Sequence, residues 1–147
     1  MISVKFPVAI SAAFLWIGFV CAISFMEAWL KFRAPGITIP LGLGIGRLVF
    51  GALNKIEWVL AIIVAANLVL GKGTILKWEF LLYLVPLLLI LLQTVWLLPA
   101  LDARAELHIQ HLEVPPSNLH FVYVGMEIIK VICLTSFGIA LFKSHTL

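Results

Sequence analysis

Three glutamates lie inside or next to the apolar stretches of this chain, where they are the first candidates for chemistry. Glu27 follows the first apolar stretch, Glu57 interrupts the second and Glu127 interrupts the last. A charged side chain at the centre of a bilayer costs at least about 2.5–3.5 kcal/mol, so such residues should face other helices and have partners there. Three carboxylates from three different helices suit a cation, or a small substrate that exchanges protons.

Basic residues follow two of these glutamates at the spacing of helical neighbours. Residues three or four apart lie on the same face of a helix. We therefore expect Glu27 to pair with Lys31, in the favourable order for an i,i+4 pair. Glu127 should pair with Lys130 on its own helix, or with Arg47 from another segment.

The remaining glutamate, Glu57, has two basic residues on its own segment. We expect it to pair with Lys55 or Arg47, both of which precede it. One interpretation of all these charges is purely structural: they neutralise one another and hold the helices in register. The other interpretation is a polar pocket that opens at one membrane face.

Further polar side chains are expected near the same membrane face as these charges. On the last apolar segment His120, Tyr123, Glu127 and Lys130 recur at steps of three and four, which places them on one side of a helix. In the halves of the apolar segments nearer the opposite membrane face, the only polar side chains are Asn67 and residues with hydroxyl groups. The predicted set of ligand- or ion-binding residues is Glu27, Arg47, Asn54, Glu57, Asp102, Arg104, His120, Tyr123, Glu127 and Lys130.

Histidines offer a second kind of site. His108 and His111 are three residues apart, and the candidates for a metal ligand set are His108, His111, His120 and Glu127. Imidazole and carboxylate groups suit several transition metals. The Glu-x-x-His pairs of bundled di-iron proteins are absent from the sequence. These residues do not identify a metal, a haem or any other cofactor.

Little in the chain indicates covalent catalysis. No serine stands in a Gly-x-Ser-x-Gly setting. Cys21 and Cys133 lie in apolar runs at different expected depths, so we expect neither a reactive thiol nor a disulfide between them. The sequence favours a protein that is not an enzyme, and a metal- or haem-dependent membrane enzyme is the third interpretation.

The amino-acid composition indicates whether these residues lie in a water-soluble domain or in a membrane. Of 147 residues, 63% are hydrophobic and 12% are charged, whereas soluble domains are about 25% charged. A chain this short cannot hide so much apolar surface from water in one globule. The sequence therefore predicts an integral membrane protein, and it argues against nucleic-acid binding, disorder and a disulfide scaffold.

The apolar stretches predict a single all-α transmembrane domain over residues 1–147. Four spans are expected at 6–30, 47–70, 79–101 and 120–142, joined by short loops into an antiparallel bundle. The first span is longer than a signal-peptide core and lacks a cleavage site after it, so it should stay in the mature protein. The distribution of Lys and Arg favours termini in the cytoplasm.

Glycines are dense just before the predicted second span. Gly42 and Gly46 form a small-xxx-small pair that lets another helix approach closely. The same glycines could instead mark a broken or re-entrant segment, which membranes tolerate where protein or water covers the backbone.

The second half of the chain carries a further pattern. It consists of Leu98-Pro-Ala-Leu-Asp-Ala-Arg104, then Pro115-Pro116, Leu119-His120, Tyr123, Glu127 and Lys130. This pattern resembles small bacterial four-span membrane proteins of unknown function. The resemblance implies a compact four-helix fold and a location in a bacterial inner membrane. It strengthens Asp102, Arg104, His120, Glu127 and Lys130 as candidates for a shared site, but it implies no reaction. Small multidrug exporters share the four spans and a first-span glutamate only by analogy.

Together these features predict a membrane protein that binds or transports a small polar or cationic molecule or ion at a one-sided polar pocket. The alternative is a non-catalytic subunit or assembly factor of a larger membrane complex. The expected partners of this protein are the lipid bilayer, a small polar or cationic ligand, and either a second copy of the chain or the rest of a membrane complex.

Overall fold

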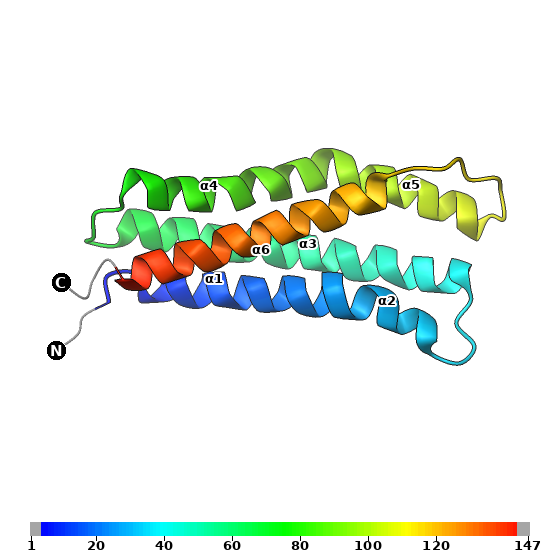
Figure 1. The fold of residues 1–147 in the computed structure, drawn as a ribbon, viewed down its shortest axis with the longest axis horizontal. Helices are drawn as coiled ribbons and strands as arrows, with labels where there is room; N and C mark the ends of the chain where they lie inside the picture. The colour runs from blue at the N-terminus through cyan, green and yellow to red at the C-terminus, as the bar shows by residue number, and fades with distance from the viewer. Residues whose placement is uncertain (1–3, 144–147) are drawn as a thin grey trace.

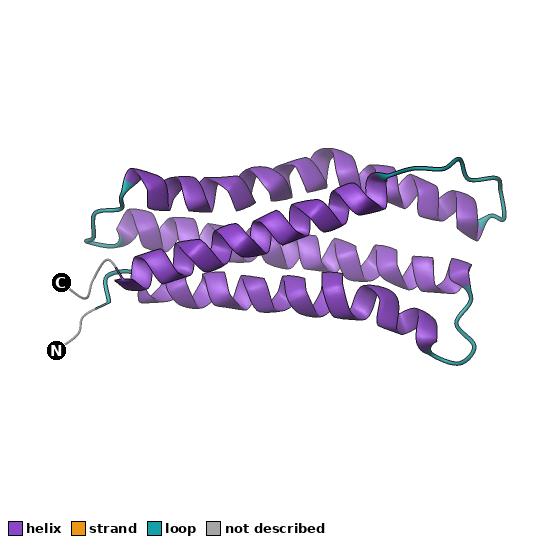
Figure 2. Cartoon of the chain, viewed as in Figure 1, coloured by secondary structure: helices purple, strands orange, loops and turns teal. Residues whose placement is uncertain are grey.

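The computed structural model describes residues 4–143, a range that contains helices and loops but no strand. The first helical run comprises α1 (Pro7–Val20), the π-helical segment η1 (Cys21–Glu27), α2 (Ala28–Leu30) and the 3₁₀ segment η2 (Lys31–Arg33). The second is α3 (Ile39–Leu70), and the third comprises α4 (Lys77–Leu92), the π-helical segment η3 (Gln93–Leu97) and α5 (Leu98–Ile109). The fourth is α6 (Leu119–Lys143). The four runs lie side by side, with the start of α1 and the end of α6 at the same end of the bundle (Figure 1 and Figure 2).

All four runs are long and apolar enough to cross a membrane. Their most apolar windows have mean hydropathies of 2.3, 1.9, 2.4 and 1.8 in chain order. The prediction of an all-α bundle of four transmembrane helices is therefore confirmed, and the protein is a multi-pass membrane protein by helix length and composition. Residues 1–3 and 144–147 of the predicted domain lie outside the described range.

The second run is longer than its predicted span. It begins at Ile39, eight residues before the predicted start, because Thr38 accepts a hydrogen bond from the Leu41 N–H and Pro40 occupies the first turn. Its 32 residues reach about 48 Å, well beyond a hydrocarbon core of about 30 Å. One end of α3 must therefore stand in the headgroup region or in water.

The glycine-rich start of α3 is a continuous helix rather than a broken one. Gly42 is buried against the ring of Phe32, and Gly46 lies against the side chain of Lys31. A side chain at Gly42 would overlap that ring, so the absence of a Cβ is what lets η2 pack on α3. The structure thus agrees with close packing as the role of Gly42, whereas a Cβ at Gly46 would make only ordinary contacts with Lys31 and Phe50.

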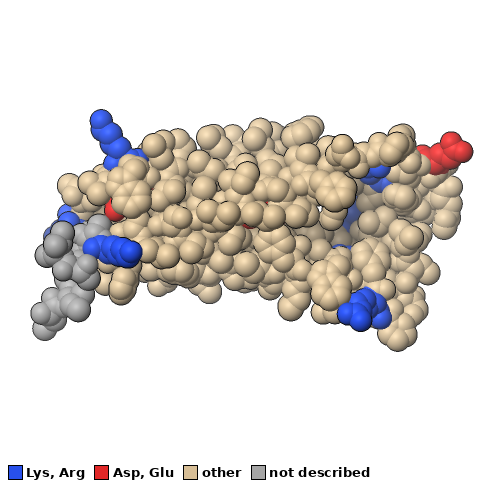
Figure 3. Space-filling view, viewed as in Figure 1, with Lys and Arg blue, Asp and Glu red and all other residues tan. Residues whose placement is uncertain are grey.

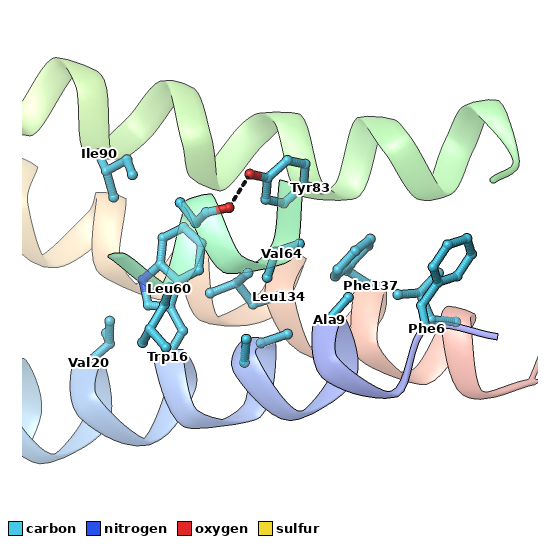
Figure 4. Close-up of a cluster of buried hydrophobic side chains, with 14 residues drawn as sticks. Phe6, Ala9, Trp16, Val20, Leu60, Val64, Tyr83, Ile90, Leu134 and Phe137 are labelled. Carbon is cyan, nitrogen blue, oxygen red and sulfur yellow. Dashed lines mark hydrogen bonds between the residues drawn. The ribbon is translucent and has the colours of Figure 1, made fainter. Parts of the chain in front are cut away.

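The largest apolar core occupies the end of the bundle nearest the start of α1. Phe6, Ala9, Trp16, Val64 and Phe137 are all fully buried there. Figure 4 shows these side chains meeting between α1, α3, α4 and α6, with the Tyr83 hydroxyl donating to the Ala61 carbonyl at 2.8 Å. Figure 3 shows Lys, Arg, Asp and Glu side chains gathered towards the two ends of this face of the molecule, with a surface almost free of charged side chains between them.

Candidate functional site

Lys130 occupies the middle of the bundle and is the centre of a buried polar network. Its Nζ donates to Glu57 Oε1 at 2.5 Å, to Glu127 Oε1 at 2.6 Å and to Gln93 Oε1 at 2.7 Å. The side chains of Lys130, Glu57 and Glu127 are at most 2% exposed. A lysine ammonium has three donors, and here each has its own acceptor. We call Glu57, Glu127 and Lys130 the ionic centre.

The two carboxylates of the ionic centre also bind neutral donors. Glu57 Oε1 accepts a hydrogen bond from Trp16 Nε1 at 2.8 Å. Glu127 Oε1 accepts one from Gln93 Nε2 at 2.6 Å, and Glu127 Oε2 accepts one from Ser24 Oγ at 2.8 Å. All four membrane-spanning runs therefore contribute to one network, which is the arrangement that buried charges need in order to be tolerated.

The network lies at mid-helix rather than near a surface. Gln93 has 16 helical residues before it and 16 after it in the run from Lys77 to Ile109. Lys130 has 11 residues of α6 before it and 13 after it. The ionic centre is therefore close to the middle of the membrane-spanning part of the bundle.

The predicted partner of Glu57 was wrong, although the other two predicted pairs are confirmed. Glu57 pairs with Lys130 across the bundle and not with Lys55 or Arg47. Residues 55 and 57 are two apart and so point to different sides of α3: Lys55 is exposed, whereas Glu57 is buried. The local pairs Glu127–Lys130 at 2.6 Å and Glu27–Lys31 at 3.1 Å form as expected.

Two π-helical segments supply polar members of the network. Ser24 belongs to η1 and Gln93 to η3. Pro99 follows η3 closely and has no N–H to bond the carbonyl of Val95, which accounts for a local distortion there. The structure gives no equivalent cause for η1. Single-turn π segments occur often at functional sites because they re-aim side chains within a helix.

A hydrogen-bonded chain leads from the ionic centre towards the far end of the bundle. Ser24 Oγ, which donates to Glu127, also lies 3.1 Å from the hydroxyl of Tyr123. Because the Ser24 proton is used by the carboxylate, the hydroxyl of Tyr123 must donate to Ser24. The rings of Tyr123 and Phe50 meet edge-on with centroids 5.2 Å apart.

Asn54 and Thr94 form a smaller polar group beside this chain. Thr94 Oγ1 accepts from Trp58 Nε1 at 2.9 Å, donates to the Ile90 carbonyl at 2.6 Å and lies 3.1 Å from Asn54 Oδ1. Asn54 is 8% exposed, and its Nδ2 has no hydrogen-bond partner among residues 4–143.

A pocket with a volume of about 570 Å³ lies at the far end of the bundle, between the end of the first run, α3, α5 and the start of α6. Its apolar lining includes Phe32, Leu43, Phe50, Leu98 and Leu101. Its polar and charged lining residues are Lys31, Arg47, Asn54, Lys55, Thr94, Asp102, His120 and Tyr123. We call this cavity the end pocket.

Salt bridges join the elements around the end pocket. Arg47 on α3 binds Asp102 and Glu106 on α5, with Nη2 2.9 Å from Asp102 Oδ2. All three side chains are partly exposed. Arg104 Nη2 donates to the carbonyl of Pro115 at 2.6 Å, which attaches α5 to the loop before α6.

The structure divides the predicted site residues into groups. Glu57, Glu127 and Lys130 meet in the ionic centre, whereas Glu27 lies apart from them with Lys31. Arg47, Asn54, Asp102, His120 and Tyr123 line the end pocket, and Arg104 binds the following loop instead. None of the three glutamates expected to hold a cation together lines the end pocket.

The predicted metal candidates do not form a common cluster in the described part of the chain. Within residues 4–143, no group of three or more His, Cys, Asp or Glu side chains is placed to hold a metal ion. His108 and His111 are both exposed, and His111, just after α5, has the left-handed φ of 57° that ends the helix. Cys21 and Cys133 are both free, as expected.

Sequence reasoning missed several members of the network. Trp16 and Ser24 look like ordinary membrane-helix residues, and Gln93 is the sole uncharged amide in its span. That isolated amide is a signal, since a polar side chain in an apolar helix needs a partner. The comparisons with known proteins found no match among protein-family models, curated proteins or solved structures.

Proposed function

We propose that this membrane protein binds a small polar molecule with an apolar body in the end pocket, as a step in moving that molecule through the membrane. The observation that carries this proposal is the end pocket itself, which combines an apolar wall with charged residues and touches Tyr123 of the buried network. Ligand sites are typically mainly apolar cavities of about 300–1,000 Å³ with a few polar groups.

The charges around the end pocket favour an anionic or acceptor-rich ligand head over a bare cation. Three basic residues, Lys31, Arg47 and Lys55, line the pocket, against the single carboxylate of Asp102. Lys31 and Arg47 already have carboxylate partners, whereas Lys55 is exposed and forms no ion pair among the described residues. A polar ligand with a negative end would gain from Lys55 without breaking either existing salt bridge.

Binding can be tested by filling the end pocket from a glycine. Gly51 lines the pocket, and a Cβ placed on it would meet no atom within 4 Å, so Gly51→Phe should enter the cavity without disturbing the backbone. Gly44→Phe is the matched control, because Gly44 lies on the same helix, has equally open space and does not line the pocket. Both changes also remove a helix-weakening glycine.

The assay is titration of purified protein in nanodiscs with a fluorescent medium-chain fatty acid that carries a dansyl group. We expect saturable binding in the wild type and in Gly44→Phe, weaker binding in Lys55→Gln, and no saturable binding in Gly51→Phe. Equal binding by Gly51→Phe and the wild type would place the probe elsewhere and contradict the proposal.

The same preparation separates this function from that of a complex subunit. Purification in mild detergent should yield one monodisperse species without a second protein in fixed ratio. A stoichiometric partner, combined with absence of probe binding, would favour the role of a subunit or assembly factor.

A further inference from the structure

The ionic centre contains one more acid than base. The titratable groups packed into it from the described elements are Glu57 from α3, and Tyr123, Glu127 and Lys130 from α6. The runs that contain α1 and η3 contribute only side chains that do not titrate, through Trp16, Ser24 and Gln93.

Ionisation of both carboxylates and of the lysine leaves a net charge of −1 in the buried middle of the bundle. The tyrosine hydroxyl is neutral while it donates to Ser24. An unbalanced charge is strongly disfavoured at that depth, and no further cationic side chain within residues 4–143 reaches either carboxylate. Addition of one proton to either carboxylate makes the centre neutral.

We propose that Glu57 and Glu127 together bind one exchangeable proton, so that the ionic centre switches between net charges of −1 and zero. The two acceptor oxygens, Glu57 Oε1 and Glu127 Oε1, contact the same ammonium at 2.5 and 2.6 Å. A proton on one carboxylate therefore weakens the ion pair between that carboxylate and Lys130, and it strengthens the ion pair between Lys130 and the other carboxylate. This inference depends on the ionic centre alone and not on what the end pocket binds.

The hydroxyl chain supplies a route for that proton. Tyr123 lines the end pocket, its hydroxyl donates to Ser24, and Ser24 donates to Glu127 Oε2 at 2.8 Å. A hydronium ion in the pocket can give its proton to Tyr123 Oη while the proton of Tyr123 moves to Ser24 Oγ and that of Ser24 moves to Glu127 Oε2. At Tyr123 Oη and Ser24 Oγ one O–H bond forms as another breaks, whereas the hydronium loses one O–H bond and Glu127 Oε2 gains one. Water remains in the pocket, and rotation of the two hydroxyls restores the chain.

Infrared difference spectroscopy of the protein in phosphatidylcholine vesicles tests whether the ionic centre binds an exchangeable proton. Lowering the pH should produce one C=O band of a buried carboxylic acid that shifts in D₂O. Glu57→Gln and Glu127→Gln each leave one carboxylate and one ammonium, so each should abolish the pH-dependent band while the protein stays folded. Glu27→Gln is the control, since Glu27 pairs with Lys31 outside the centre, and its spectrum should match the wild type.

The route has its own matched pair of variants. Tyr123→Phe removes the first hydroxyl of the chain, and we expect deuterium exchange of the carboxyl band to be about tenfold slower or more, which is about 1.4 kcal/mol in the barrier. Tyr83→Phe removes an equally buried hydroxyl that donates to the Ala61 carbonyl and should leave the exchange rate unchanged.

Each result decides a part of the proposal. A carboxyl band that is absent at every pH, present at every pH, or retained in both Glu57→Gln and Glu127→Gln would overturn the exchangeable proton. A normal band with equal exchange rates in Tyr123→Phe and the wild type would overturn the route. Absence of saturable probe binding in the wild type, together with an intact carboxyl band, would count against the proposed function alone.

Discussion

Lys130→Met is the substitution that most directly tests how the bundle tolerates charge at its middle. Methionine is similar in length but has no donor, so Glu57, Glu127 and Gln93 each lose a hydrogen bond of 2.5–2.7 Å. Glu57 and Glu127 keep their neutral donors but have no cation left. Removal of one partner from a buried ion pair typically costs about 3–5 kcal/mol, and we expect a loss of unfolding free energy in this range.

The loss of unfolding free energy in Lys130→Met should depend on pH, and the direction of that dependence follows from the charges. In the variant the two remaining carboxylates have no neutralising lysine, so the folded protein gains more from binding protons than the wild type does. By linkage, the stability difference between Lys130→Met and the wild type should be largest at alkaline pH and should shrink as the pH falls.

Reversible unfolding in mixed micelles, followed by circular dichroism, measures these differences. The triple variant Glu57→Gln, Glu127→Gln, Lys130→Met removes all three charges and should recover most of the loss, because replacing a whole buried ion network is often nearly neutral. Lys55→Met is the control for loss of an exposed lysine and should stay within about 0.5 kcal/mol of the wild type. If Lys130→Met were as stable as Lys55→Met at every pH, the argument that Lys130 neutralises a buried centre would fail.

Two further predictions concern contacts between helices, one beside the end pocket and one at the opposite end of the bundle. Gly42→Val places side-chain atoms on the ring of Phe32 and should cost about 1–3 kcal/mol in unfolding free energy. Gly44→Val is the control, because its side chain meets open space and should cost less than about 1 kcal/mol. Equal losses would show that the close approach of η2 to α3 is unimportant for stability. Asn67→Leu removes the acceptor 2.8 Å from the Ala9 N–H in the first turn of α1 and should cost about 1–3 kcal/mol in the same assay; an unchanged stability would mean that this N–H finds another partner.

The fold could be predicted because its main determinants are local. Four long apolar stretches separated by polar loops specify four helices and their antiparallel order, without any knowledge of contacts. The start of α3 was misplaced because the glycines before Arg47 are compatible with a broken segment as well as with a helix. The helix extends through these glycines to Ile39 and places Arg47 against Asp102. Helix length is limited by capping and tertiary contacts as well as by bilayer thickness.

The candidate site could be predicted only where it is made by neighbours on one helix. Glu127 and Lys130 are three residues apart, so their pairing follows from helical geometry. The partnership of Glu57 with Lys130 depends on how α3 and α6 are rotated against each other, and residue spacing within a helix contains no such information. The buried Glu79, whose Oε2 accepts from the Leu76 N–H, was overlooked because it lies at a helix start where a carboxylate is commonplace.

The position of the ionic centre has a consequence for what the bundle can conduct. On one side Tyr123, whose hydroxyl bonds Ser24, also lines the end pocket. On the other side lies the apolar core of Phe6, Ala9, Val64 and Phe137, where the Tyr83 hydroxyl donates to the Ala61 carbonyl. Among the described residues, the hydrogen-bonded chain that leaves the centre through Ser24 and Tyr123 runs away from that core. If the centre takes up the proposed proton, exchange at the side of the end pocket is therefore favoured over conduction through the bundle.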